Sequence, residues 1–304
     1  MPWTRRARLM LAFAGASLFA SGGANCAGLP AEAPGVFVYQ FDTWTVFRQG
    51  DYAAIHRAPM SSGEQAGDHV SGEESWIVLI DRRDLEGIWS EVRARDFEAL
   101  PREGEGSFVA AGPGQDQSEV LRLIIGDDAV CDLYRTGLRL RPDLRAPFEA
   151  LNLAIAGVFS ERRAHPVLPE RLELSVTLKR QGRGSSWTLV GASGSGSLRR
   201  LGDARSAREA GAVSLQREEV AGLWEYFSSR NLLARESYES VRLRTPGGEF
   251  GDSALVVVTV NGFRALDVRS ARPVRKDAAL DSLQERIGAF FARNAGPAKK
   301  GGGS

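Results

Sequence analysis

Histidine and cysteine are scarce in this chain of 304 residues, which contains three of the first and two of the second. Metal sites usually need histidine, cysteine or carboxylate ligands gathered at short spacings. His56, His69 and His165 are too far apart in sequence for any two to share one turn of a helix. We therefore predict that the protein holds no metal and no other cofactor.

Catalytic motifs are also missing from the sequence. It has no glycine–any–serine–any–glycine turn and no cysteine in the setting of a papain-like protease. The paired carboxylates Asp81/Asp84 and Asp127/Asp128 fall where a helix cap and a hairpin tip are expected, so each pair has a structural explanation. We predict that the protein is not an enzyme.

Long hydrophobic runs are absent as well, and none approaches the 18 or so residues of a transmembrane helix. The stretch Leu9–Ala20 is apolar, follows Arg5, Arg6 and Arg8, and is followed by small residues. This is the pattern of a secretory signal peptide. We predict a signal peptide over residues 1–28 and an exported protein, either periplasmic or extracellular.

Cys26 ends the signal region at the place where a bacterial lipoprotein carries its acylated cysteine. Gly23 and Asn25 differ from the residues usual before such a cysteine, so two outcomes stay open. In one, Cys26 is lipidated and anchors the protein to a membrane leaflet. In the other, the signal is cleaved nearby and the product is soluble.

The chain lacks an excess of either charge, with a formal net charge of +1. Removal of residues 1–28 takes away three arginines and no acids, which leaves 36 basic and 38 acidic residues. A nucleic-acid-binding protein would show a basic excess. We predict no nucleic-acid partner, a membrane partner only through a lipidated Cys26, and otherwise another envelope or secreted protein.

The chain contains an internal sequence repeat, with two copies 135 residues apart. Without any gap, 15 of 100 positions are identical between residues 36–135 and 171–270. Cys131 has Leu266 as its counterpart, which indicates a buried apolar position rather than a nucleophile. The repeated residues include Gly87, Trp89 and Arg95, which return as Gly222, Trp224 and Arg230.

Each copy has the pattern of three strands, a helix, two strands and a second helix. Alternating apolar residues predict the strands, and apolar residues three and four apart predict helices with one buried side. In the first copy the strands are 36–42, 52–57, 76–80, 120–125 and 130–134. The helices carry Leu85, Ile88, Trp89 and Val92, then Phe148, Leu151, Ile155 and Phe159. We expect Trp89 and its counterpart Trp224 to be core residues.

The second copy repeats this order. Its Asn261-Gly262 pair, between two apolar runs, is typical of a tight hairpin turn. Asp81 and Gln216, each with an acid three residues later, predict the starts of equivalent helices. The fold class we predict is α+β: two tandem homologous β-β-β-α-β-β-α domains, each an antiparallel sheet with helices packed on one face.

We place the first domain at 29–160, a linker at 161–170, the second domain at 171–294 and a disordered tail at 295–304. The element order, with a Trp-bearing helix and a late Asn-Gly hairpin, resembles uncharacterised domains of exported bacterial proteins. The resemblance covers both repeats but is one of architecture, and it brings no functional residues with it.

The most informative difference between the copies is at the first hairpin, where Thr43–Phe47 in the first copy corresponds to Leu178–Gly182 in the second. We expect Trp44 and Val46 to face away from the buried aromatic residues that precede them. A strand that is apolar on both faces needs a cover, which could be the other repeat, another protein or a small ligand. The predicted binding residues are Trp44, Val46, Phe47 and Arg48, since tryptophan and arginine are common in binding hot spots.

The function we predict is non-catalytic binding or scaffolding in the bacterial cell envelope through protein–protein contacts. One alternative is an inhibitor or immunity-type protein of a secreted hydrolase. The other is a hydrolase with its site in the cleft between the repeats. That reading would need His56 or His69 beside a carboxylate of shifted pKa.

Overall fold

The computed structural model describes most of both repeats. The described residues are 29–58, 75–95, 97, 100, 108–110, 119–135, 138–180, 183–192, 195–201, 211–234, 238–239, 253–270 and 278–295. The predicted signal peptide with Cys26, His69, and residues 296–304 of the predicted tail lie outside them.

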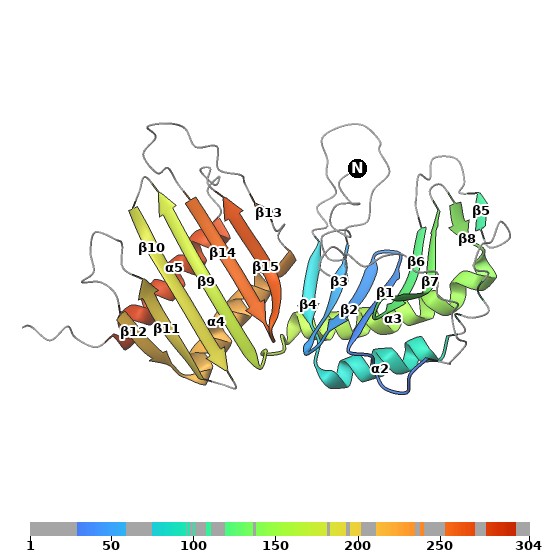
Figure 1. The fold of residues 1–304 in the computed structure, drawn as a ribbon, viewed down its shortest axis with the longest axis horizontal. Helices are drawn as coiled ribbons and strands as arrows, with labels where there is room; N and C mark the ends of the chain where they lie inside the picture. Colours follow the sequence, from blue (N-terminus) through green and yellow to red (C-terminus); the bar gives the residue numbers. More distant parts are fainter. Residues whose placement is uncertain are drawn as a thin grey trace, which may run out of the picture. The chain divides into compact units, whose positions relative to one another are not determined.

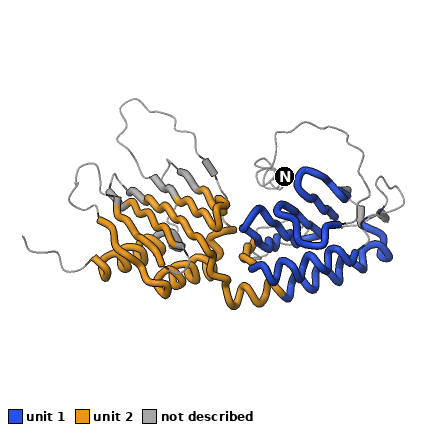
Figure 2. Tube along the Cα trace, turned by 60° about the horizontal axis from the view of Figure 1, so that its bottom comes forward, with its two compact units in different colours: residues 1–73, 81–157 blue, residues 74–80, 158–304 orange. Residues whose placement is uncertain are grey.

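The chain divides into two compact units (Figure 2). Unit 1 comprises residues 1–73 and 81–157, and unit 2 comprises residues 74–80 and 158–304. The boundary at 157/158 falls inside α3 (Pro142–Ala164), whose last turn occupies the start of the segment predicted as a linker. Each repeat forms a sheet with helices, so the predicted α+β class and the tandem arrangement are confirmed.

The first sheet has six strands in the order β4-β3-β2-β1-β6-β7 (Figure 1). The pairs β1–β2, β2–β3, β1–β6 and β6–β7 are antiparallel. Its strands are β1 (Val36–Phe41), β2 (Trp44–Gln49), β3 (Tyr52–Arg57), β4 (Trp76–Leu79), β6 (Glu119–Ile125) and β7 (Asp128–Arg135). A separate antiparallel pair joins β5 (Phe108–Ala110) to β8 (Leu138–Leu140).

The second sheet has seven strands in the order β12-β11-β10-β9-β14-β15-β13 (Figure 1). All neighbours are antiparallel except β13 and β15, which are parallel. The strands are β9 (Arg171–Arg180), β10 (Arg183–Ala192), β11 (Ser195–Leu201), β12 (Gly211–Leu215), β13 (Tyr238–Glu239), β14 (Ser253–Val260) and β15 (Phe263–Ser270).

In unit 1 the helices cover one face of the sheet, which we call the inner face. Phe37 and Phe41 share that face of β1, because side chains alternate along a strand. The Phe37 ring lies 5.1 Å from Trp89 of α2 (Arg82–Arg93), and the Phe41 ring lies 5.7 Å from Phe148 of α3. The opposite side of the sheet is the outer face.

Unit 2 is built in the same way. Trp187 of β10 contacts Phe291 of α5 (Ala278–Asn294), with ring centroids 5.2 Å apart. On the same face, a Cβ atom at Gly196 of β11 would come within 3.0 Å of Val220 in α4 (Arg217–Ser229). A glycine at this position therefore lets α4 lie close against the sheet.

Each repeat has one more strand before its first helix than the sequence predicted. Four strands, β1–β4, precede α2, and β9–β12 precede α4. Asp42 adopts a positive φ of 56° and ends β1, so residues from Trp44 onward form a new strand instead of the end of the first. In the second repeat, residues 187–192, the counterpart of the predicted strand 52–57, form the last part of the longer β10.

The starts of α2 and α4 confirm the repeat, since they lie 135 residues apart. Asp81 caps α2 by accepting a bond from the Asp84 backbone N–H at 2.9 Å. In α4, the Gln216 backbone N–H donates to the Glu219 carboxylate at 3.0 Å. Bonds from Asn294 and from the Gln216 backbone hold the pKa of Glu219 below its usual value.

Substitution of Asp81 by alanine is expected to lower the free energy of unfolding by about 1 kcal/mol, because helix N–H groups lose their acceptor. Urea denaturation of the purified protein measures the change. Glu86→Gln, in the next turn of α2, removes the same charge outside the cap and keeps an oxygen that can accept the Ala33 backbone N–H, so it serves as a control. An equal effect of the two substitutions would contradict the capping role.

The repeated tryptophans are core residues, as predicted. Trp89 is 1% exposed and Trp224 is 2% exposed. The Trp89 indole N–H donates to the Pro30 carbonyl at 3.0 Å, and that of Trp224 donates to the Val167 carbonyl at 2.7 Å. In both repeats the indole thus fastens the segment that leads into the first strand of its sheet.

Candidate functional site

Strand β2 carries all four residues predicted to bind, but they lie on two faces of the sheet. The register pairs Trp44 with Phe41, Val46 with Tyr39, and Arg48 with Phe37, which places these three on the inner face. Phe47 pairs with Val38 and lies on the outer face. The predicted orientation of Trp44 and Val46 is wrong, because a two-residue turn pairs odd positions of β1 with even positions of β2.

Val46 is a core residue and presents no surface to a partner. Its side chain is 0% exposed, between Tyr39 on β1 and Ile55 on β3 in the register. Arg48 is held by the fold, since its guanidinium donates to the carbonyls of Ala33 at 2.6 Å and Gly50 at 3.1 Å. Val46 is therefore unavailable for contact, whereas Arg48 is half-buried and already bonded within unit 1.

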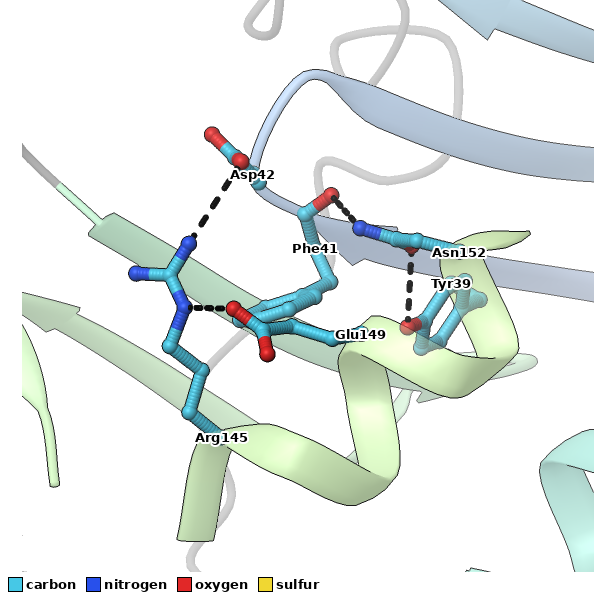
Figure 3. Close-up of polar contacts among 6 residues, drawn as sticks. All are labelled: Tyr39, Phe41, Asp42, Arg145, Glu149 and Asn152. Atoms are coloured by element: carbon cyan, nitrogen blue, oxygen red, sulfur yellow. Dashed lines mark hydrogen bonds and ion pairs between the residues drawn. The ribbon is translucent and has the colours of Figure 1, made fainter. Parts of the chain in front are cut away.

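Trp44 is half-buried near the tip of the first hairpin. The Arg57 guanidinium lies 5.6 Å from the centre of its ring, a cation–π arrangement. Arg145 of α3 approaches the hairpin turn, with 3.8 Å between its guanidinium and the Asp42 carboxylate, and it also pairs with Glu149 (Figure 3). The hairpin tip is therefore joined to α3 by charge as well as by packing.

A polar pair behind the hairpin fixes β1 against α3 (Figure 3). The Tyr39 hydroxyl donates to the Asn152 side-chain oxygen at 3.5 Å, and the Asn152 amide donates to the Phe41 carbonyl at 3.3 Å. Burial raises the pKa of Tyr39, so the phenol stays protonated and remains a donor. The hydrogen bonds of Tyr39 and Asn152 are thus made within unit 1, and they hold β1 against α3.

Phe47 belongs to a row of apolar side chains on the outer face. The row runs across five strands, and each residue is the direct cross-strand partner of the next. Val38, Phe47 and Ile124 are half-buried, so part of each remains accessible. The row, which we call the apolar row, consists of Ala54, Phe47, Val38, Ile124 and Ala129.

The next row on the outer face is polar throughout. It contains an ion pair in which the Arg122 guanidinium lies 2.9 Å from the Asp132 carboxylate. Its members, in the same strand order, are His56, Thr45, Gln40, Arg122 and Asp132. The outer face of unit 1 thus places an apolar row beside a polar one.

The equivalent row in unit 2 is mostly polar. Val38 corresponds to Glu173, Ile124 to Thr259 and Ala129 to Arg264, each at the repeat distance of 135 residues. The full row is Ser197, Val190, Glu173, Thr259 and Arg264. The two sheets are built alike but differ in the polarity of this row. A comparison of the two repeats at those three pairs of positions would have shown the difference from the sequence alone.

Other candidate chemistry does not gather in the described parts of the chain. Among them, no group of three or more His, Cys, Asp and Glu side chains could hold a metal ion. Cys131 is a buried free thiol whose pKa burial and Asp132 raise to about 12, so it is not ionised near neutral pH. His56 lies opposite Thr45 on the outer face.

A pocket in unit 2 is too small for a ligand. It is lined by Trp76, Arg163, Pro166, Trp224 and Leu233 among others, and its interior of about 10 Å³ has room for one water molecule. Within the described ranges, no helix is both long and apolar enough to cross a membrane.

Comparison with known proteins gives no match, either to a protein-family model or to a curated protein.

Proposed function

We propose that this is a non-catalytic binding protein of the bacterial cell envelope, and that the apolar row contacts a protein partner. The observation that carries the proposal is the difference between the two sheets. Architecture alone does not require Val38, Phe47 and Ile124 on the outer face, because unit 2 forms the same sheet with Glu173, Val190 and Thr259 there. Partly accessible apolar side chains in a row therefore indicate a surface selected for contact.

The shape and surroundings of the row favour a protein over a small molecule. Ala54 at the β3 end is 4% exposed, so the accessible part of the row crosses four strands. Strands about 4.8 Å apart make this part about 14 Å long on a sheet surface, whereas small-molecule sites are concave. The polar row of His56, Thr45, Gln40, Arg122 and Asp132 lies along one side. An apolar centre with a polar margin is the usual composition of a protein–protein interface.

The envelope location is inferred from the signal-peptide pattern of residues 1–28. Lipidation of Cys26 would add a membrane anchor to the same binding function. The intact mass of the exported protein separates the two outcomes, because acyl chains add a large increment to the mass of the cleaved chain.

Substitution of Phe47 by alanine is expected to weaken partner binding by about 2 kcal/mol, or roughly thirtyfold, as truncation of an aromatic hot-spot residue does. The partner is captured from the envelope of the bacterium that encodes the protein, purified, and titrated against the wild type and the variant by calorimetry.

Two control variants make this test specific. Trp44→Ala removes an aromatic side chain from the same strand but from the inner face, and Val190→Ala removes an apolar side chain, 55% exposed, from the equivalent row of unit 2. Both are expected to bind as the wild type does. If Trp44→Ala loses the partner and Phe47→Ala retains it, the site is at the hairpin tip and the apolar row is not the contact surface.

A further inference from the structure

Strand β4 belongs to the first repeat by sequence but groups with unit 2 in space (Figure 2). Its sequence Trp76-Ile77-Val78-Leu79 has no polar residue, and Val78 and Leu79 are buried. The equivalent strand β12 reads Gly-Ala-Val-Ser-Leu and buries only alternate residues. A strand that is apolar at successive positions is packed on both sides.

Unit 2 holds the backbone of β4 with one side chain, that of Asn231. The Ile77 backbone N–H donates to the Asn231 side-chain oxygen at 3.3 Å, and the Asn231 amide nitrogen donates to the Ser75 carbonyl. The carboxamide therefore bonds to the backbone on either side of Trp76, at the Ser75 carbonyl and the Ile77 N–H, and we say that it brackets Trp76. A residue of a neighbouring parallel strand would make the same two bonds with its backbone. Asn231 is the buried polar residue of the described chain, at 7% exposed, which fits a group whose hydrogen bonds are all made inside the protein.

The local fold places Asn231 for this contact. It follows α4 with a φ of 51°, and its backbone N–H donates to the Ser228 carbonyl at 2.9 Å. Asparagine tolerates the left-handed region better than other residues with a side chain, apart from aspartate. One residue thus ends the helix and directs its amide toward β4.

The side chains of Trp76 and of the residues after it complete the contact. The Arg163 guanidinium lies 4.0 Å from the centre of the Trp76 ring, a close cation–π pair. Val78 and Leu79 line the small pocket together with Trp224 and Leu233. Unit 2 therefore contacts the strand through its backbone, its aromatic ring and its aliphatic side chains.

We propose that residues 158–304 of unit 2 contain a strand-binding site, formed by Asn231, Arg163, Trp224 and Leu233, and that β4, the other segment of unit 2, is its ligand. The class of ligand is an extended apolar segment with an aromatic residue at the bracketed position and aliphatic residues after it. The β12 strand does not fit this class, because Gly211 replaces Trp76 and Ser214 replaces Leu79. The site is thus occupied by β4 of the same chain.

Hydrogen exchange at the Ile77 amide, followed by NMR in the full chain, tests the site. Asn231→Gly keeps the left-handed backbone, which glycine adopts readily, but removes the carboxamide. We expect the Ile77 amide to exchange at least tenfold faster in this variant. Asn231→Asp, which has no N–H for the Ser75 carbonyl, is expected to act in the same direction.

Two further variants keep the result interpretable. Asn261→Gly makes the same change at another left-handed asparagine, one whose side chain accepts a bond from the Arg171 backbone, and should leave Ile77 exchange unchanged. Arg163→Gln changes an exposed residue, so it is not expected to disturb folding, and should also accelerate exchange at Ile77. Unchanged exchange in Asn231→Gly, or in Arg163→Gln should Asn231→Gly fail to fold, would overturn the proposal.

Discussion

Replacement of Trp89 by alanine is expected to lower the free energy of unfolding of unit 1 by about 3–5 kcal/mol. The side chain is 1% exposed and its ring packs against Phe37 at 5.1 Å, so truncation leaves a cavity between α2 and the sheet. The Pro30 carbonyl also loses its indole donor. Because single domains are stable by only about 5–15 kcal/mol, this one change would remove a large part of the stability.

Urea denaturation followed by far-ultraviolet circular dichroism measures the change, with three variants beside it. Trp224→Ala should destabilise unit 2 by a similar amount, because Trp224 has the same burial and the same kind of carbonyl partner. Trp89→Phe keeps a ring but loses the N–H, so it should cost about 1–3 kcal/mol. Trp44→Ala changes a half-buried residue, and a loss as large as that of Trp89→Ala would contradict the core assignment.

The parts of the fold that the sequence predicted are those governed by local rules. The Asn261-Gly262 turn has a positive φ at both residues, 50° and 83°, which is what its dipeptide predicts. The cap formed by Asp81 and Asp84, and the apolar stripe that places Trp89 in the core, depend on spacings of three and four residues. Such signals depend on residues within about one turn of the chain, so they can be recognised without knowing the tertiary structure.

The missed strand shows where local rules fail. Asp42 and Thr43 are not a strong turn pair, yet they separate β1 from β2. The apolar positions change from odd numbers, ending at Phe41, to even numbers at Trp44 and Val46. This change fits a two-residue turn as well as a single strand that is apolar on both faces, so the pattern alone did not distinguish the two. What fixes the turn is the pairing of Tyr39 with Val46 across the hairpin, which buries both completely.

The candidate site could be predicted only in part for the same reason. Phe47 was among the predicted binding residues, because the first hairpin differs between the copies, but its face and its neighbours depend on register. Val38 and Ile124 join Phe47 through strand pairs that link positions up to 86 apart in the sequence. The Asn231 bracket is less predictable still, since no pattern in either segment signals a bond across 154 residues.

The corrected register leads to a second large effect, at Val46. Substitution of Val46 by aspartate is expected to destabilise unit 1 by at least about 4 kcal/mol, the range reached when an unpaired charge is buried. Val46 is 0% exposed, and its cross-strand partners Tyr39 and Ile55 lie in the core. Thermal and urea unfolding of the variant measure the loss.

Thr45→Asp provides the matched control, because it places the same charge one residue away on the outer face. Thr45 is half-buried between Gln40 and His56, where water and polar groups can solvate a carboxylate, so the change should be within about 1 kcal/mol. The originally predicted orientation, with Val46 pointing away from Tyr39, requires the reverse order of effects. A stable Val46→Asp beside an unfolded Thr45→Asp would restore it and remove Phe47 from the outer face, and with it the apolar row.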